Sequence, residues 1–362
     1  ASAYLRLTPS IVRYRAAGLS LGPEGRIRIE NRVIAKLSRR EVARQFMAAA
    51  PDAMLRDLVT SGAITSTQAR LAAQVPMADD VTVEGDSGGH TDRRPLVCLL
   101  PSLIALRDEL QADYRFTTPV RVGAAGGLGT PEAVLGALMM GAAYVVTGSI
   151  NHASVESGTS PAVKTLLAEA EATDVMMAPA ADMFEMGVQL QVLKRGTLFP
   201  MRARKLYELY ETYDSLNEIP ADEREKLETR VFQREFDAVW QDCVDFFEAR
   251  DPRQIERARN HPKRKMALIF RWYLGLATHW AIRGVKERRM DYQIWCGPAM
   301  GAFNDWARGS FLEDPAERNV VTMAQALMTG AAHQYRRQHL QMQGVTGVSA
   351  WQPASLMKGA RV

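Results

Sequence analysis

The sequence predicts an α/β fold in which a β/α barrel is followed by an all-helical region. In roughly the first 200 residues, short β-rich segments alternate with segments of helical periodicity, and this pattern is typical of parallel-sheet architecture. From about Tyr207 onward, apolar residues instead recur every three or four positions, which is the spacing of amphipathic helices. All 6 tryptophans lie in this second half. The two halves therefore differ in composition as well as in period.

Five segments are expected to form strands, each followed by a helical segment. The expected strands are 2–7, 32–37, 80–85, 120–125 and 142–147. Helices are expected over 39–50, 52–73 and 96–110. Thr65 and Gln68 have the spacing of a capping box within the second helical stretch. A further strand is expected at 174–178, outside the barrel.

Residues 1–206 are expected to form a TIM-type (β/α)8 barrel in part, with its strands four to eight. Residues 207–340 are expected to form a helical domain that binds substrate or carrier, and residues 341–362 a tail. Five strands cannot close an eight-stranded barrel. The chain is therefore expected either to be truncated or to continue from leading strands that precede Ala1.

Composition favours a globular protein of the cytoplasm. Apolar residues make up 47% and charged residues 24% of the chain, as in ordinary globular domains. No apolar run approaches the roughly 20 residues that a membrane span needs, and the net charge of +4 does not indicate nucleic acid. The 3 cysteines and 6 histidines show neither disulfide-framework nor metal-ligand spacing, so no metal site is expected.

A glycine-rich loop follows the strand at 120–125. Gly126 and Gly127 precede Thr130, an expected N-cap, and Pro131, an expected first helical residue. Glycines allow backbone N–H groups to approach an anion, and the amino terminus of a helix attracts negative charge. The glycine spacing does not match the dinucleotide fingerprint, which favours a phosphate site of the barrel type over a Rossmann domain.

A second loop supports this interpretation. Thr147, Gly148 and Ser149 end the next expected strand, and β/α barrels bind phosphate with the loops after strands seven and eight. The alternative is that these glycines serve only tight turns.

A histidine follows the strand at 80–85. Catalytic residues of barrels lie at the carboxyl ends of strands, and His90 could give a proton or a hydrogen bond to a developing enolate. Asp86 and Asp92 are candidates to orient it, and the alternative is a structural histidine that caps the helix at Pro95. Lys36 ends another strand and either contacts phosphate or a ring, or extends its amine into solvent.

These motifs occur in an order that resembles the nitronate monooxygenase and FMN-dependent enoyl reductase superfamily. Within it, segments 78–92, 187–196, 199–200 and 297–304 are similar to the PfaD family. Members of that family are trans-acting enoyl reductases of polyunsaturated fatty acid synthases and trans-acyltransferase polyketide synthases. The resemblance covers nearly the whole chain up to about Tyr335.

The resemblance implies that FMN phosphate binds Gly126, Gly127, Gly148 and Ser149, with His90 beside the flavin ring. NADPH would reduce FMN, and hydride would then pass to the β-carbon of an enoyl thioester on an acyl carrier protein. The other residues expected to contact the cofactor are Lys36, Glu84, Asp86, Ser87, Gly88, Gly89, Ala125 and Thr147.

Basic clusters in the helical half are candidates for carrier docking. They occupy 258–267 and 283–289, and Lys263, Arg264 and Lys265 are the residues expected to attract an acidic carrier. A solvated helix face is the alternative. Trp272, Trp280 and Trp295 are expected in the core, and Cys296 is expected to be a buried thiol.

Two other functions remain open at this point. One is an FMN oxidase similar to nitronate monooxygenase, which shares the barrel and the histidine. The other is a non-catalytic docking component of a megasynthase. A homodimer is compatible with the sequence.

Overall fold

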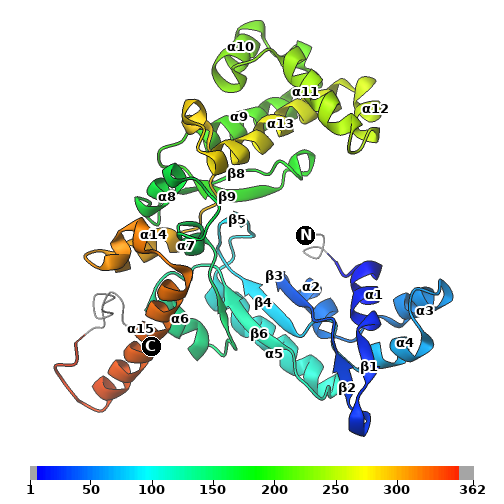
Figure 1. The fold of residues 1–362 in the computed structure, drawn as a ribbon, viewed down its shortest axis with the longest axis vertical. Helices are drawn as coiled ribbons and strands as arrows, with labels where there is room; N and C mark the ends of the chain where they lie inside the picture. The colour runs from blue at the N-terminus through cyan, green and yellow to red at the C-terminus, as the bar shows by residue number, and fades with distance from the viewer. Residues whose placement is uncertain (1–5, 350–362) are drawn as a thin grey trace. The chain divides into compact units, whose positions relative to one another are not determined.

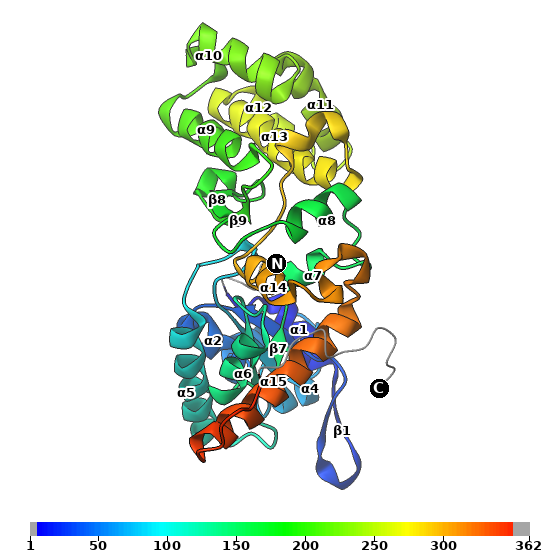
Figure 2. The same cartoon turned by 90° about the vertical axis from the view of Figure 1, so that its left-hand side faces the viewer.

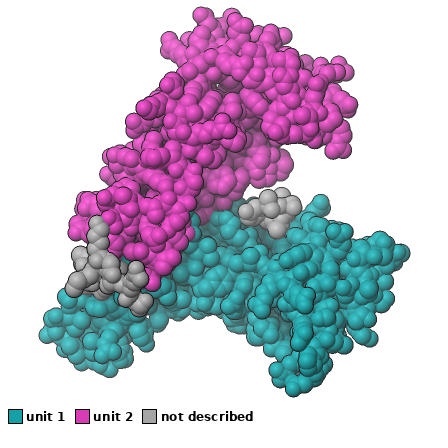
Figure 3. All heavy atoms as spheres, viewed as in Figure 1, with its two compact units in different colours: residues 1–86, 92–148, 326–351 teal, residues 87–91, 149–325, 352–362 magenta. Residues whose placement is uncertain are grey.

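The computed structural model describes residues 6–349, and these divide into two compact units (Figure 3). Unit 1 comprises residues 6–86, 92–148 and 326–349 of the described chain. Unit 2 comprises residues 87–91 and 149–325. The two units do not meet at Tyr207, where the sequence predicts a domain boundary. Tyr207 lies inside the continuous helix α9 (Phe199–Thr212). The expected domain limits stay a prediction.

Unit 1 is built on a four-stranded parallel sheet with the order β3-β4-β6-β7. Its strands are β3 (Ile34–Leu37), β4 (Asp80–Glu84), β6 (Arg121–Ala125) and β7 (Val145–Val146). Spatial order follows chain order, as in successive β/α units of a barrel. The predicted parallel α/β class is confirmed. The last strand is shorter than the predicted 142–147.

Helices cover one face of this sheet. They are α2 (Arg40–Met47), α5 (Leu96–Tyr114) and α6 (Pro131–Met139), and they connect the strands (Figures 1 and 2). Val81 and Val83 of β4 are fully buried and share one apolar core with Val122 of β6 and Leu103 of α5. Because side chains alternate along a strand, the residues between these valines project from the opposite face.

The first part of unit 1 differs from expectation. Of the predicted strand 2–7, residues 1–5 lie outside the described residues, and Arg6 and Leu7 have no regular structure. The chain then forms α1 (Pro9–Ala17) and a hairpin of β1 (Leu19–Leu21) and β2 (Ile27–Ile29), which the sequence pattern did not indicate.

The predicted stretch 52–73 forms two helices, α3 (Asp52–Thr60) and α4 (Ser66–Ala72). Thr65 and Gln68 make the predicted capping box at the start of α4: the Thr65 hydroxyl accepts from the Gln68 amide N–H at 3.1 Å, and the Gln68 side chain accepts from the Thr65 amide N–H at 2.9 Å. The capping prediction is confirmed.

Unit 2 contains a small antiparallel sheet and a group of helices. The sheet has the order β5-β9-β8, with β5 (Gly89–His90), β9 (Gln189–Leu193) and β8 (Val175–Pro179). The strand predicted at 174–178 thus lies outside the parallel sheet, as expected. The helices are α7 (Ser149–His152), α8 (Pro161–Ala168), α9, α10 (Ala221–Lys226), α11 (Phe236–Glu248), α12 (Arg253–Arg259), α13 (Pro262–Arg283) and α14 (Ala299–Ala307).

The helices α9, α11 and α13 (Figure 2) contribute to one aromatic core, in which Phe199, Phe236, Phe270 and Tyr273 are almost fully buried. Shorter helical segments, mostly 3-10 turns, lie at Pro23–Gly25, Phe184–Met186, Leu216–Glu218, Leu227–Phe232, Lys286–Asp291, Phe311–Glu313 and Pro315–Glu317. The helix α15 (Val320–Met342) has its first residues in unit 2 and the others in unit 1. Within residues 6–349, no helix combines the length and apolar character needed to cross a membrane.

Candidate functional site

The uncovered face of the parallel sheet is polar. Ala35 and Leu37 of β3 are buried in the core, so Lys36 projects from the other face. There its Nζ lies 2.7 Å from Oε1 of Glu84, which is only 7% exposed. An ion pair offsets the cost of burying the Glu84 carboxylate. The structure therefore brings together two residues that were predicted separately as cofactor contacts.

The glycine-rich loop after β6 has the backbone that the sequence predicts. Gly126 and Gly127 have φ angles of +85° and +74°, a region that favours glycine. A Cβ on Gly126 would lie 2.8 Å from the carbonyl carbon of Gly85, whereas one on Gly127 would meet no described atom within 4 Å. Gly126 thus permits close packing of two loops, and Gly127 borders open space.

The helix that follows is capped as expected. The Thr130 hydroxyl accepts from the Ala133 amide N–H at 3.3 Å, and Pro131 begins α6. In the sheet, Ala125 of β6 pairs with Val146 of β7, so the loops at Gly126 and Gly148 leave the same edge of unit 1. A Cβ on Gly148 would also meet no described atom within 4 Å. This edge can accommodate an anionic group against backbone.

In unit 2, His90 lies on β5 rather than in a loop, paired with β9 opposite Leu190. Its Nε2 lies 3.1 Å from Oδ1 of Asp182. The imidazole also meets the Trp295 indole edge-on, with ring centroids 5.7 Å apart and planes at 84°. The His90 side chain is 26% exposed. The His90 ring is therefore in contact with Asp182 and Trp295, and part of it is accessible to solvent.

The two glycines before His90 allow a close approach of backbone. A Cβ on Gly88 would lie 2.9 Å from backbone atoms of Cys296, and one on Gly89, where φ is +78°, would lie 2.8 Å from the Trp295 ring. The Gln191 side-chain amide donates to the Ser87 carbonyl at 2.8 Å. These glycines therefore pack against protein in unit 2 and fix the position of the next residue.

The segment around Trp295 is fixed from its other side. The Gly297 amide N–H donates to Oγ of Ser149 at 2.9 Å, and Nδ1 of His152 lies 3.1 Å from the Trp295 carbonyl. Burial lowers the pKa of His152, which keeps that ring neutral near pH 7. Ser149, predicted as a phosphate ligand, thus has a structural contact within unit 2.

Two expectations about this region were wrong. Trp295 is not in the core: it is 44% exposed. Its segment runs beside β9, and its ring occupies the space that a side chain on residue 89 would need. Asp92 does not orient His90. It belongs to unit 1, where Arg39 and Ser38 bond its carboxylate, and the Arg39 hydrogen bond lowers the pKa of Asp92.

Cys296 is buried, as expected. Burial raises the pKa of its thiol to about 12, so a thiolate nucleophile is not available near neutral pH. Trp272 and Trp280 pack against the aromatic core of the helices, also as expected. Residues 6–349 contain no cluster of three or more His, Cys, Asp or Glu side chains that could hold a metal ion.

The cations predicted to dock a carrier have partners inside the helical region. Nζ of Lys263 donates to the Tyr213 carbonyl at 2.8 Å and pairs with Asp214 at 3.1 Å. Arg264 donates to Gln254 at 3.1 Å. Lys265 lies 3.6 Å from Asp237 and over the Trp240 ring.

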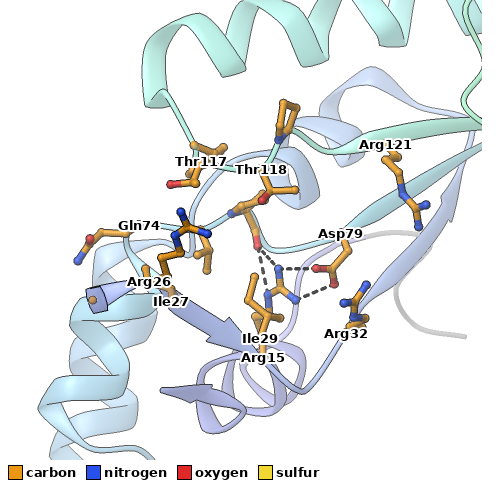
Figure 4. Close-up of a pocket in the computed structure, with 15 residues that line it drawn as sticks. Arg15, Arg26, Ile27, Ile29, Arg32, Gln74, Asp79, Thr117, Thr118 and Arg121 are labelled. Atoms are coloured by element: carbon orange, nitrogen blue, oxygen red, sulfur yellow. Dashed lines mark hydrogen bonds and ion pairs between the residues drawn. The ribbon is translucent and has the colours of Figure 1, made fainter. Parts of the chain in front are cut away.

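A cavity of about 650 Å³ lies at the amino-terminal ends of β4 and β6, the edge opposite to the glycine loops (Figure 4). Arg26, Arg32 and Arg121 contribute cationic groups to its lining. Arg15 is fully buried and donates to the carbonyls of Pro76 and Asn31 and to Asp79. Its hydrogen bonds are satisfied by protein groups, so the role of Arg15 is structural.

Comparison with known proteins identifies the family. The enoyl reductase domain of MlnA, from the macrolactin biosynthesis cluster of Bacillus amyloliquefaciens, superposes with a TM-score of 0.89 at 36% identity; the match covers 93% of this chain and 75% of that one. The chain belongs to this enoyl reductase family. The membership predicted from the motifs is confirmed, and the strand order of the parallel sheet in unit 1 agrees with the predicted partial β/α barrel.

Two curated proteins are also similar in sequence. One is a component of the polyunsaturated fatty acid synthase of Thraustochytrium sp., 54% identical over 317 residues, and the other is the polyketide biosynthesis protein PksE of Bacillus subtilis, 48% identical over 332 residues. These matches cover 86% and 92% of the chain but only 21% and 43% of the two relatives. Residues 213–292 separately match the family model of the inserted helical domain of acyl-carrier-protein S-malonyltransferase.

Proposed function

We propose that the chain is an FMN-dependent enoyl reductase that acts in trans on enoyl thioesters carried by an acyl carrier protein. The observation that carries the proposal is the similarity over 93% of the chain to an enoyl reductase domain. In unit 1, the glycine loops at one sheet edge support phosphate binding. In unit 2, a partly exposed histidine beside an exposed indole supports proton transfer next to a flat ring.

The residues of each unit fit the groups of FMN. The open space at Gly127 and Gly148 leaves room for phosphate oxygens to meet backbone N–H groups. Lys36 and Glu84, with Asp86 and Ala125 at the same sheet edge, are proposed as further cofactor contacts. Ser87, Gly88, Gly89, Thr147 and Ser149 complete the proposed set. When bound, FMN supplies hydride transfer between a nicotinamide nucleotide, proposed to be NADPH, and the substrate β-carbon.

The proposed role of His90 is to supply the proton that the α-carbon gains. Hydride addition at the β-carbon places negative charge on the thioester enolate, and an imidazolium can hydrogen-bond this charge and then give up its proton. Asp182 and Trp295 hold the ring in place while this happens. His90 is the only residue to which we assign a catalytic role.

Flavin content and substrate dependence test the proposed function. The full-length protein should carry bound FMN with the absorption spectrum of oxidised flavin. Under anaerobic conditions it should oxidise NADPH in proportion to added enoyl thioester. Activity with a nitronate and oxygen but not with the enoyl thioester would show an oxidase instead. A colourless protein without turnover would show a non-catalytic docking component.

We also propose that the helical region docks the carrier through basic residues, as the sequence analysis predicts for Lys263, Arg264 and Lys265. Because these three have internal partners, the second predicted cluster is better suited. Arg283, Lys286 and Arg289 are exposed, and no ion pair forms on their side chains within the described part of the chain. The apolar side chains of Ile282 and Met290 beside them are each 45% exposed.

Charge reversal separates the two clusters. Lys286→Glu combined with Arg289→Glu should raise KM for carrier-bound substrate roughly tenfold, because complementary charge mainly sets the encounter rate. Turnover of a free enoyl thioester should not change. Lys263→Glu combined with Lys265→Glu makes the same charge reversal in the first cluster and is the matched comparison. Equal losses with carrier-bound and free substrate would contradict docking at either cluster.

A further inference from the structure

We infer that Asp182 is a positioning residue that fixes the orientation and the tautomer of His90. This inference rests on the proposed catalytic role of His90. The observation is the 3.1 Å contact between Nε2 of His90 and Oδ1 of Asp182. The two residues are 92 positions apart in the chain, so no local motif indicates the pair.

The loop that carries Asp182 is anchored on both sides. The Ala180 amide N–H donates to the Val188 carbonyl at 2.9 Å, which continues the pairing of β8 with β9. Arg271 of α13 donates to the Ala181 carbonyl at 2.8 Å and pairs with Glu185 at 3.0 Å. His90 itself is paired to β9. The strands β5 and β8 both pair with β9, and this arrangement places the His90 imidazole beside the Asp182 carboxylate.

The contact determines which ring nitrogen faces substrate. An ionised carboxylate can only accept hydrogen bonds, so Nε2 of His90 must carry a hydrogen in this contact. Within the described residues, Nδ1 has no hydrogen bond. In the imidazolium form, Nδ1 therefore carries the proton that can be transferred. Without Asp182 the neutral ring could place its hydrogen on either nitrogen.

The proposed step balances with this assignment. Hydride, which NADPH would supply by way of bound flavin, adds to the β-carbon, the electron pair of the carbon–carbon double bond moves to the α-carbon, and the proton on Nδ1 forms the new α-carbon–hydrogen bond. His90 is left as a neutral imidazole whose Nε2 hydrogen still points at Asp182. Solvent then restores the proton to Nδ1.

Trp295 restricts the ring from the other side. Its edge-on contact at 84° and the close approach at Gly89 prevent the imidazole from turning away from Asp182 without moving the indole. Asp182 is 62% exposed, and water weakens such a contact. The expected effect of removing the charge is therefore smaller than that of removing His90.

The test is a double-mutant cycle with a matched control. Asp182→Asn should lower kcat for a free enoyl thioester about tenfold, the loss expected for one charge-assisted hydrogen bond, with KM and the rate of flavin reduction by NADPH unchanged. Asp182→Glu should restore most of the activity. Asp305→Asn removes a carboxylate that is also 62% exposed, in the pair with Arg308, and should have no effect.

The decisive measurement is the effect of Asp182→Asn when His90 is already alanine. If Asp182 acts through His90, it should cause no further loss in that background. The same loss in both backgrounds, or no loss in either, would overturn the inference while leaving the reductase activity intact. Unchanged turnover in His90→Ala alone would overturn both this inference and the catalytic role of His90. A protein without flavin or reductase activity would instead overturn the proposed function.

Discussion

Replacing His90 by alanine is expected to lower turnover by about 10²- to 10⁴-fold, the usual contribution of a positioned acid or base. The variant should retain its flavin, because the residues proposed to bind phosphate include Gly127 and Gly148 of unit 1 but not His90, which lies on β5 of unit 2. Stopped-flow measurements can separate flavin reduction by NADPH from flavin oxidation by the enoyl thioester. The loss should be confined to the second half-reaction.

A second histidine variant is the control for any general effect of replacing a histidine by alanine. His339 lies on α15 and is exposed, and its ring contacts Gln343 and Tyr335 of the same C-terminal segment. His339→Ala should leave both half-reactions unchanged. A His90→Ala enzyme with normal turnover would refute the catalytic role, and loss of flavin colour would show that the residue supports cofactor binding instead.

Gly301→Ala should strongly destabilise unit 2. A Cβ on Gly301 would lie 1.9 Å from the backbone nitrogen of Ala172 and 2.2 Å from the carbonyl carbon of Glu171. The helix cannot easily move away, because the Asn304 side chain donates to the carbonyls of Leu167 and Ala170 at 2.9 and 2.8 Å. The expected loss in the free energy of unfolding is about 3 kcal/mol.

Gly275→Ala is the control in the same unit. Gly275 lies within α13, and a Cβ there would meet no described atom within 4 Å. Because alanine has the higher helix propensity, this change should stabilise the protein by roughly 0.5–1 kcal/mol. Urea unfolding of both variants gives the comparison. Similar stabilities for the two would show that α14 does not pack on the backbone at Ala172.

The parts of this fold that the sequence predicted depend on local signals. The strands β3, β4 and β6 are short apolar runs, the helices show periodicity, and Thr65 and Thr130 stand at cap positions. These signals arise within a few residues, so no tertiary information is needed to detect them. The hairpin of β1 and β2 escaped prediction because its strands are only three residues long.

The surroundings of His90 could not be predicted, because they depend on contacts between segments that lie far apart in the sequence. Asp92 is two residues away in sequence but is bonded by Arg39, whereas Asp182 and Trp295 come from distant segments. Trp295 was expected in the core because most tryptophans at that spacing are buried. The signal that could have corrected this is the pair of glycines before His90, which indicates that something bulky passes close by.

Arg15 has a consequence for how the protein unfolds. Its guanidinium joins α1 to the segment before β3 and to the loop before β4, through acceptors on Asn31, Pro76 and Asp79. Opening α1 alone would leave a buried cation and several buried carbonyls without partners, which costs several kcal/mol. The helix α1 is therefore expected to melt together with the sheet as one cooperative unit, and its amide hydrogens should share the protection of the strands.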